Sequence, residues 1–216
     1  MKNNRTELVF ILDRSGSMAG LESDTIGGFN SLLEKQKKEE GEAVVTTVLF
    51  DNQYELLHDR FDIHNVKPVT ERDYYVRGNT ALLDAVGKTI SKIANVQRNA
   101  GDGEKAEKVV FVIITDGMEN ASREFTYSQI RKMIQLEKDV YGWEFVFLGA
   151  NIDAEEVAGR YGIKADRAVN YHADSQGLKN SYDSVSEAVF EMRINNCISK
   201  DWKKRAEKDF KDREKV

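Results

Sequence analysis

The chain has 216 residues and a formal net charge of -5 at pH 7, with 40% hydrophobic and 32% charged residues. This length predicts one globular domain with a single sizeable core, and the acidic balance argues against a nucleic-acid-binding surface, which would be basic. The single cysteine, Cys197, excludes an intrachain disulfide and favours a reducing compartment.

The first predicted element is a strand at residues 8–12, LVFIL, which follows a short basic start. This apolar stretch is too short for the core of a signal peptide. No run in the chain approaches the roughly 18 apolar residues that a membrane helix needs. We therefore expect a cytoplasmic protein that does not associate with a membrane.

Further strands are expected where short apolar runs recur along the chain. The runs at 8–12 and 108–115 are apolar at consecutive positions, which is typical of central strands covered on both faces in a parallel sheet. The more polar segment 53–61 follows a turn-like break, so we expect it to pair antiparallel with the strand before it, near a sheet edge. The full set is 8–12, 43–50, 53–61, 108–115, 144–150 and the weaker 168–171.

Helical periodicity fills the segments between the strands. In the clearest case, Leu83, Val86, Ile90 and Ile93 lie on one face of a single predicted helix. The alternation of strands with helices predicts βαβ units with right-handed crossovers, and hence an α/β fold. The predicted helices are 22–40, 80–98, 126–138, 153–161 and 178–198.

The last segment differs in composition from the rest of the chain. From Ser199 onwards it contains eight Lys or Arg and five Asp or Glu residues. Trp202, Ala206 and Phe210 recur every four residues, which predicts a helix with a narrow apolar stripe. We therefore divide the chain into a domain at 1–198 and a charged helical tail at 199–216, which either packs on the domain or docks a partner.

Oxygen-bearing side chains follow the strands at 8–12 and 108–115 and also open the helix at 80–98. In a doubly wound sheet, ligands bind outside the carboxyl ends of the strands, near the point where strand order reverses. Two carboxylates and three hydroxyls, without sulfur or imidazole, select Mg²⁺, Mn²⁺ or Ca²⁺, and so few carboxylates favour Mg²⁺ with water in its shell. The predicted metal ligands are Asp13, Ser15, Ser17, Thr80 and Asp116.

Each part of this set also has a plain structural interpretation. Residues 13–17 could form an ordinary turn in which Ser17 caps a helix, and Thr80 could be only a helix N-cap. The sequence Thr-Asp-Gly at 115–117 is common in turns. The occurrence of all three parts in this order, after two buried strands and before one helix, favours a metal site.

These motifs resemble those of a known family. D-x-S-x-S at 13–17, G-x-T at 78–80 and T-D-G at 115–117 are similar to the metal-ion-dependent adhesion site (MIDAS) of von Willebrand factor type A (VWA) domains. The resemblance covers about residues 5–197 and implies a Rossmann-like, three-layer α/β/α fold. Its sheet would be six-stranded and mostly parallel, with one antiparallel edge strand.

The resemblance also implies roles for the ligands and a function. Ser15 and Ser17 would contact the metal directly, Thr80 and Asp116 directly or through water, and Asp13 through water. The function implied is a non-enzymatic binding module, in which the metal coordinates an Asp or Glu of a partner protein. The stretch TDGMENAS looks like intracellular bacterial members, so the partner is expected to be an ATPase or another operon-encoded protein.

The residues around the metal site are assigned from their adjacency to the ligands in the sequence. Rim residues would be Arg14, Met18, Asn79 and Glu119.

Two other functions stay open. A Mg²⁺-dependent phosphatase of haloacid-dehalogenase type would need an acid two residues after its nucleophilic Asp, where this chain has a serine. A structural subunit whose metal only stabilises the fold is the other alternative.

Overall fold

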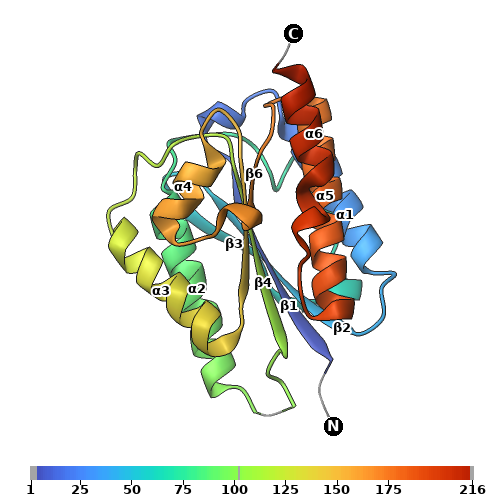
Figure 1. Cartoon of the computed structure of the whole chain (residues 1–216). Helices are drawn as coiled ribbons and strands as arrows, with labels where there is room; N and C mark the ends of the chain where they lie inside the picture. Colours follow the sequence, from blue (N-terminus) through green and yellow to red (C-terminus); the bar gives the residue numbers. More distant parts are fainter. Residues whose placement is uncertain (1–3, 102, 215–216) are drawn as a thin grey trace.

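A computed structural model describes residues 4–101 and 103–214 and shows a six-stranded sheet between two layers of helices (Figure 1). The strand order is β3-β2-β1-β4-β5-β6. Neighbouring strands are parallel except β2 and β3, which form an antiparallel hairpin at one edge. The predicted fold class and the antiparallel edge strand are therefore confirmed. The strands are β1 Arg5–Asp13, β2 Glu42–Phe50, β3 Tyr54–Asp62, β4 Lys108–Thr115, β5 Glu144–Gly149 and β6 Ala168–Asn170.

The helices lie close to their predicted positions. On one face of the sheet are α1, α5 and α6, and on the other are α2, α3 and α4 (Figure 1). In the described part of the chain, no helix combines the length and the apolar character needed to cross a membrane. Their bounds are α1 Glu22–Gln36, α2 Leu82–Asn99, α3 Tyr127–Tyr141, α4 Ala154–Tyr161, α5 Ser175–Asn195 and α6 Lys204–Arg213, with 3-10 turns η1 Gly16–Met18, η2 Ile63–Asn65, η3 Ala165–Arg167 and η4 Lys200–Lys203.

The first helix ends four residues before the predicted end because an arginine of α5 binds the carbonyls that follow it. The Nη1 of the buried Arg193 donates to the carbonyl of Gln36 at 2.5 Å. Its Nη2 donates to the carbonyls of Glu39, Glu40 and Gly41 at 3.3, 3.2 and 3.0 Å. The charge run after α1 is thus held as a turn by one guanidinium rather than continuing the helix.

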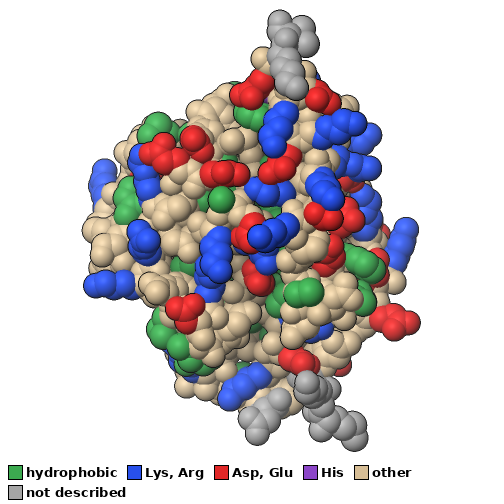
Figure 2. Space-filling model, in the orientation of Figure 1, with side chains coloured by type: hydrophobic (Ala, Val, Ile, Leu, Met, Phe, Trp, Pro, Cys, Tyr) green, Lys and Arg blue, Asp and Glu red, His purple; other side chains and the backbone are tan. Residues whose placement is uncertain are grey.

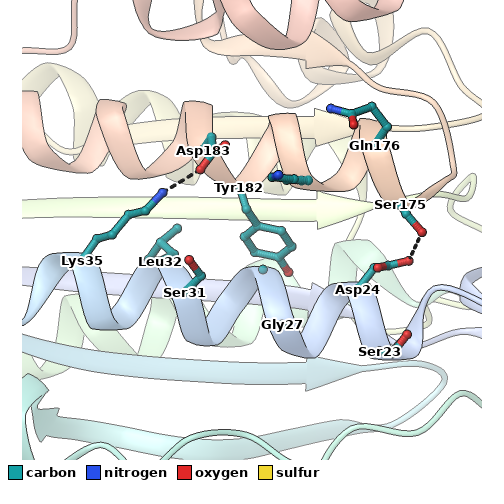
Figure 3. A pocket seen from close by; sticks show the side chains of 12 residues that line it. Ser23, Asp24, Gly27, Ser31, Leu32, Lys35, Ser175, Gln176, Tyr182 and Asp183 are labelled. Atoms are coloured by element: carbon teal, nitrogen blue, oxygen red, sulfur yellow. Dashed lines mark hydrogen bonds and ion pairs between the residues drawn. The ribbon is translucent and has the colours of Figure 1, made fainter.

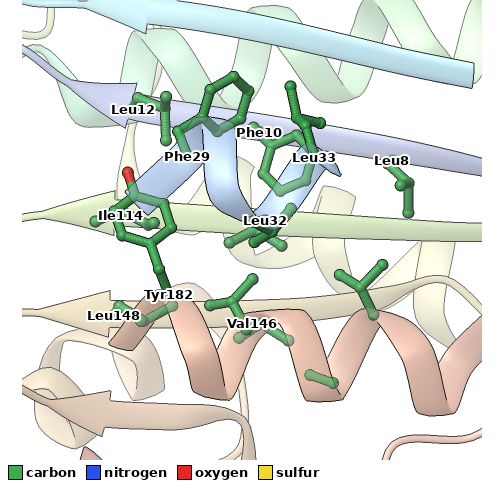
Figure 4. Packing of buried hydrophobic residues seen from close by; sticks show 14 of the residues in the cluster. Leu8, Phe10, Leu12, Phe29, Leu32, Leu33, Ile114, Val146, Leu148 and Tyr182 are labelled. Atoms are coloured by element: carbon green, nitrogen blue, oxygen red, sulfur yellow. The ribbon is translucent and has the colours of Figure 1, made fainter. Parts of the chain in front are cut away.

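Both faces of β1 are buried, as its uninterrupted apolar sequence predicts. Leu8, Phe10 and Leu12 pack against α1 and α5, as Figure 4 shows. Val9 and Ile11 point to the opposite face, towards α2 and its neighbours. Pairing with β2 on one side and β4 on the other places β1 at the centre of the sheet, and with it the position of its carboxyl end at Asp13.

The seam between α1 and α5 depends on close packing at a glycine. The ring of Tyr182 lies over α1, and a Cβ added at Gly28 would stand 2.2 Å from that ring. Beside it, Lys35 Nζ lies 2.6 Å from Asp183 Oδ1 (Figure 3). The two helices are therefore held by both ring packing and an ion pair across the seam.

The charged C-terminal segment packs on the body of the domain. Trp202 is buried and its Nε1 donates to the carbonyl of Asp166 at 2.9 Å, while Ala206 is also buried. The ring of Phe210 stacks on His172, with 4.6 Å between centroids. The apolar stripe is thus covered by the domain itself, and Lys and Arg side chains, interspersed with Asp and Glu, line the outer side of α6 (Figure 2).

Candidate metal site

The strand register brings the carboxyl ends of β1 and β4 together. Leu12 pairs with Ile114, so Asp13, the last residue of β1, lies level with Thr115, the last residue of β4. The chain passes from β1 to β2 on one side and returns through α2 to β4 on the other side. The strand order therefore reverses at this point, which is where open α/β sheets bind ligands.

Hydrogen bonds join the five residues predicted from the sequence. Ser15 Oγ lies 3.1 Å from Ser17 Oγ and accepts a hydrogen bond from Thr80 Oγ1 at 3.0 Å. Ser17 Oγ donates to Asp116 Oδ1 at 2.6 Å, and Asp13 Oδ1 accepts from the amide of Ser15 at 2.7 Å. The structure thus places all five side chains in one cluster, and metal binding by that cluster stays a prediction.

Burial shapes the electrostatics of the two carboxyl groups. Asp13 and Asp116 are each only 1% exposed. Burial raises the pKa of Asp13 to about 6, although hydrogen bonds from Thr115 and Ser15 act in the opposite direction. Burial likewise raises the pKa of Asp116, whose Oδ2 has no hydrogen-bond partner among the described residues. Negative charge is therefore disfavoured at both positions unless a cation compensates it.

Two supporting residues were missed by sequence reasoning. Thr115 Oγ1 donates to Asp13 Oδ2 at 2.5 Å, and Tyr74 Oη donates to the carbonyl of Asp13 at 2.5 Å. Both carboxylate oxygens of Asp13 are thus already engaged, which suits a residue that acts through water. The position of Thr115 follows from the strand register, whereas Tyr74 lies in a polar connection with no pattern that points to the site.

Thr80 is not the N-cap of α2, and the side chain of Glu119 accepts a hydrogen bond at the start of that helix. The N-cap is Ala81, whose side chain makes no capping bond. Glu119 Oε2 instead accepts from the amide of Leu83 at 2.7 Å, so its carboxylate faces the helix and not the rim. Asn120 Oδ1 accepts from the amide of Thr80 at 2.9 Å and fixes that residue's backbone. The Thr80 hydroxyl is consequently left for the site.

Besides Glu119, the predicted rim is wrong at two further positions. Arg14 is 0% exposed because it forms an ion pair with the buried Asp51, Nε to Oδ2 at 3.0 Å. Met18 packs in the core. Asn79 is exposed, as expected, and Met118, which adjacency did not select, is 59% exposed next to the Thr-Asp-Gly turn. The apolar part of the rim therefore follows β4 and not β1.

The donor set fits a hard divalent cation and depends on hydroxyl oxygens. Within residues 4–101 and 103–214, no group of three or more His, Cys, Asp or Glu side chains is placed to hold a metal. A Cβ at Gly117 would lie 3.0 Å from Ser17 Oγ and 3.3 Å from Thr80 Oγ1, so a larger residue would crowd the hydroxyls. Carboxylate and hydroxyl oxygens of this kind favour Mg²⁺, Mn²⁺ or Ca²⁺ over thiophilic metals.

The sequence matches no protein-family model and no curated protein. Solved structures share its fold: the ArnB paralog VWA2 from Sulfolobus acidocaldarius has a TM-score of 0.54 and 20% identity, covering 86% of this chain and 45% of that one. Manganese-loaded TRAP from Plasmodium vivax has a TM-score of 0.55 and 16% identity, and the match covers 83% of this chain and 74% of that one. Proximal thread matrix protein 1 from the mussel byssus has a TM-score of 0.55 and 14% identity, and the match covers 84% of this chain and 45% of that one.

At these identities the likeness concerns the fold alone. The matches span less than half of the VWA2 and mussel chains. The match to VWA2 nevertheless agrees with the three-layer architecture that the motifs implied. The fold of this chain is therefore of the VWA type.

Proposed function

We propose that this protein is a VWA-type interaction module in which a divalent metal coordinates an acidic residue of a partner protein. The observation that carries the proposal is the buried Oδ2 of Asp116, which lacks a hydrogen-bond partner in the described part of the chain and belongs to a cluster with three hydroxyls. When bound, the ion would supply a Lewis-acidic centre for a partner's carboxylate oxygen. TRAP, which shares the fold, was crystallised with manganese, and this supports the proposal.

The residues divide into two groups by what their atoms already do. Ser15, Ser17, Thr80 and Asp116 present oxygens to one another and would contact the ion. Asp13 uses both carboxylate oxygens in hydrogen bonds, so we assign it the orientation of Ser15 and contact through water. Mg²⁺ is the expected ion because it retains several waters and needs few carboxylates.

The phosphatase alternative is not favoured by the geometry. An acid would be required at position 15, where the Ser15 hydroxyl is instead engaged with the hydroxyls of Ser17 and Thr80. A serine hydroxyl does not protonate a leaving group near neutral pH. We therefore propose a module without catalytic activity, with a cytoplasmic ATPase or operon-encoded protein as the expected partner.

Titration with Mn²⁺, followed by electron paramagnetic resonance, tests the metal site. Wild type should bind Mn²⁺, and Asp116→Ala should weaken binding by about tenfold or more. Asp139→Ala is the matched control, because Asp139 is an exposed carboxylate on α3, distant from the cluster. The proposal fails if folded wild type binds neither Mn²⁺ nor, in competition, Mg²⁺.

A second experiment separates an interaction site from a purely stabilising metal. The immobilised protein should retain its partner in Mg²⁺ and release it in EDTA, and folded Asp116→Ala should not capture it. Substitution of each Asp and Glu on the captured protein should then identify one carboxylate whose loss abolishes binding. Capture that survives both EDTA and the Asp116 substitution would leave the metal, if any, only a structural role.

A further inference from the structure

Asp51, between β2 and β3, is fully buried and binds two arginines at once. Its Oδ2 accepts from Arg14 Nε at 3.0 Å and from Arg77 Nε at 2.7 Å. Its Oδ1 accepts from the amide of Gln53 at 2.7 Å, and its carbonyl accepts from the amide of Ala81 at 2.9 Å. One residue outside the metal cluster thus makes polar contacts with three segments of the chain.

These contacts connect the two loops that carry the candidate ligands. Arg14 lies between Asp13 and Ser15, whereas Arg77 and Ala81 flank Thr80 in the chain. Two backbone hydrogen bonds run along the same junction. The amide of Arg77 donates to the carbonyl of Arg14 at 2.9 Å, and the amide of residue 16 donates to the carbonyl of residue 78 at 3.1 Å.

Arg14 is the deeply buried arginine of this network, and one of its nitrogens has no hydrogen-bond partner among the described residues. Arg14 Nη2 lies 2.7 Å from Glu55 Oε2, and the guanidinium carbons of Arg14 and Arg77 each lie 5.3 Å from the centroid of the Tyr75 ring. In the described chain, Arg14 Nη1 is buried without a hydrogen-bond partner. A guanidinium in such surroundings depends strongly on its carboxylate, because an uncompensated buried charge is costly.

We propose that Asp51 is a positioning residue of the metal site, holding the loop of Thr80 against the loop of Ser15. The hydroxyls of Thr80 and Ser15 meet at 3.0 Å although both residues lie outside the sheet, so strand pairing does not set this distance. The carboxylate of Asp51, which binds both Arg14 and Arg77, sets the distance between the two hydroxyls instead. Residues behind metal ligands commonly tune affinity in this way. The inference rests on the proposed function for the metal, but its structural part is measurable without one.

Strand β1 offers a matched control. Glu7, also fully buried on β1, accepts from Arg60 Nε at 2.8 Å and lies six residues before Asp13, at the other end of the strand. Glu7→Gln therefore disrupts another ion pair of a buried carboxylate without touching either ligand loop. A general loss of stability would appear in both Glu7→Gln and Asp51→Asn, whereas a positioning effect would appear only in the latter.

Two measurements test the proposal on the full chain. In Mn²⁺ titrations, Asp51→Asn should weaken binding by about 10- to 100-fold, and Glu7→Gln should stay within about twofold of wild type. In amide hydrogen exchange without metal, Gly16 and Ala81 should lose protection in Asp51→Asn and keep it in Glu7→Gln. The double variant Arg14→Met/Asp51→Leu removes both buried charges, so it should regain stability but not Mn²⁺ affinity.

The outcomes separate this inference from the proposed function. Wild-type affinity and wild-type protection of both amides in Asp51→Asn would overturn the inference. If wild type binds no Mn²⁺, the proposed function fails, and amide exchange alone decides whether Asp51 positions the loops. If Asp51→Asn does not fold, the double variant decides, and wild-type protection of Gly16 and Ala81 in it would overturn the inference.

Discussion

The hydroxyl of Ser17 donates to Asp116 Oδ1 across 2.6 Å, although the two residues are 99 positions apart. This bond joins the turn after β1 to the end of β4. The second oxygen of the Asp116 carboxylate is buried and unpartnered among the described residues. An unpaired buried carboxylate oxygen costs free energy, which a bound cation would recover. Stability without metal and affinity for metal are therefore opposed at Asp116.

We predict that Asp116→Asn stabilises the metal-free protein by about 1 kcal/mol, because it removes a buried charge while an oxygen remains to accept from Ser17. In Mg²⁺ at about a hundred times the wild-type Kd, wild type should gain about 2.7 kcal/mol, and the variant, if its affinity is at least about tenfold weaker, about 1.4 kcal/mol at most. Urea unfolding in EDTA and in Mg²⁺ measures both effects, with Asp139→Asn as the control. A variant that is less stable than wild type in EDTA, or that gains as much stability from Mg²⁺ as wild type does, would contradict this prediction.

Gly117→Ala should reduce metal affinity by about tenfold while changing stability by less than about 1 kcal/mol. The added Cβ would stand 3.0 Å from Ser17 Oγ and 3.3 Å from Thr80 Oγ1, so these hydroxyls must give way by tenths of an ångström. Gly159→Ala in α4 is the control, since its Cβ meets nothing within 4 Å. It should leave Mn²⁺ affinity unchanged and stabilise α4 by about 0.5–1 kcal/mol. Equal affinities of both variants would show that the hydroxyl cluster tolerates crowding.

Much of the architecture was predictable because short apolar runs typical of strands alternate along the chain with segments of helical periodicity. The runs at 8–12 and 108–115 predicted the central strands, and the order of motifs predicted which loops carry oxygen ligands. Their convergence follows from the topology of a parallel sheet, in which carboxyl ends share one edge. The predicted fold is confirmed, and the close approach of Asp13, Ser15, Ser17, Thr80 and Asp116 agrees with the motif reading without testing metal binding.

The supporting residues were not predictable, because each depends on a partner far away in the chain. Arg14 looks like an exposed loop residue until it is paired with Asp51, 37 positions later. Glu119 looks like a rim carboxylate, yet it caps a helix that begins 37 residues before it. Neither periodicity nor motif spacing specifies such pairings. They follow only from the packed loops.

The adjacent glycines of α1 provide a test of the seam with α5. Gly28→Ala should destabilise the protein by about 1–3 kcal/mol, because its Cβ would stand 2.2 Å from the ring of Tyr182. Gly27→Ala, one residue earlier, meets nothing within 4 Å and should stabilise by up to about 1 kcal/mol. Thermal unfolding of both variants in EDTA measures the difference. Similar melting temperatures for the two would mean that α1 and α5 are less closely packed than the structure shows.

His58 on β3 should make stability depend on pH. The side chain is buried, its Nδ1 lies 3.0 Å from Thr47 Oγ1, and its ring centroid lies 5.8 Å from that of Phe61. Burial lowers the pKa of His58 below its ordinary 6.5, and attraction by Asp73 only partly offsets this. As pH falls through 6.5, the unfolded chain therefore gains a proton at this position before the folded protein does.

The resulting loss of stability approaches about 1.4 kcal/mol per pH unit until the folded histidine also titrates. Carboxyl groups whose pKa is raised by burial, Asp13 and Glu7 among them, act in the opposite sense as pH falls. The informative quantity is thus the difference in unfolding free energy between wild type and His58→Gln, measured from about pH 8 to about pH 5. The unfolding free energy of His58→Gln should rise relative to that of wild type as pH falls. His64→Gln, at an exposed position in η2, is the control for replacing a histidine as such. A difference that stays constant over this range would show that His58 is solvated enough to titrate alike in both states.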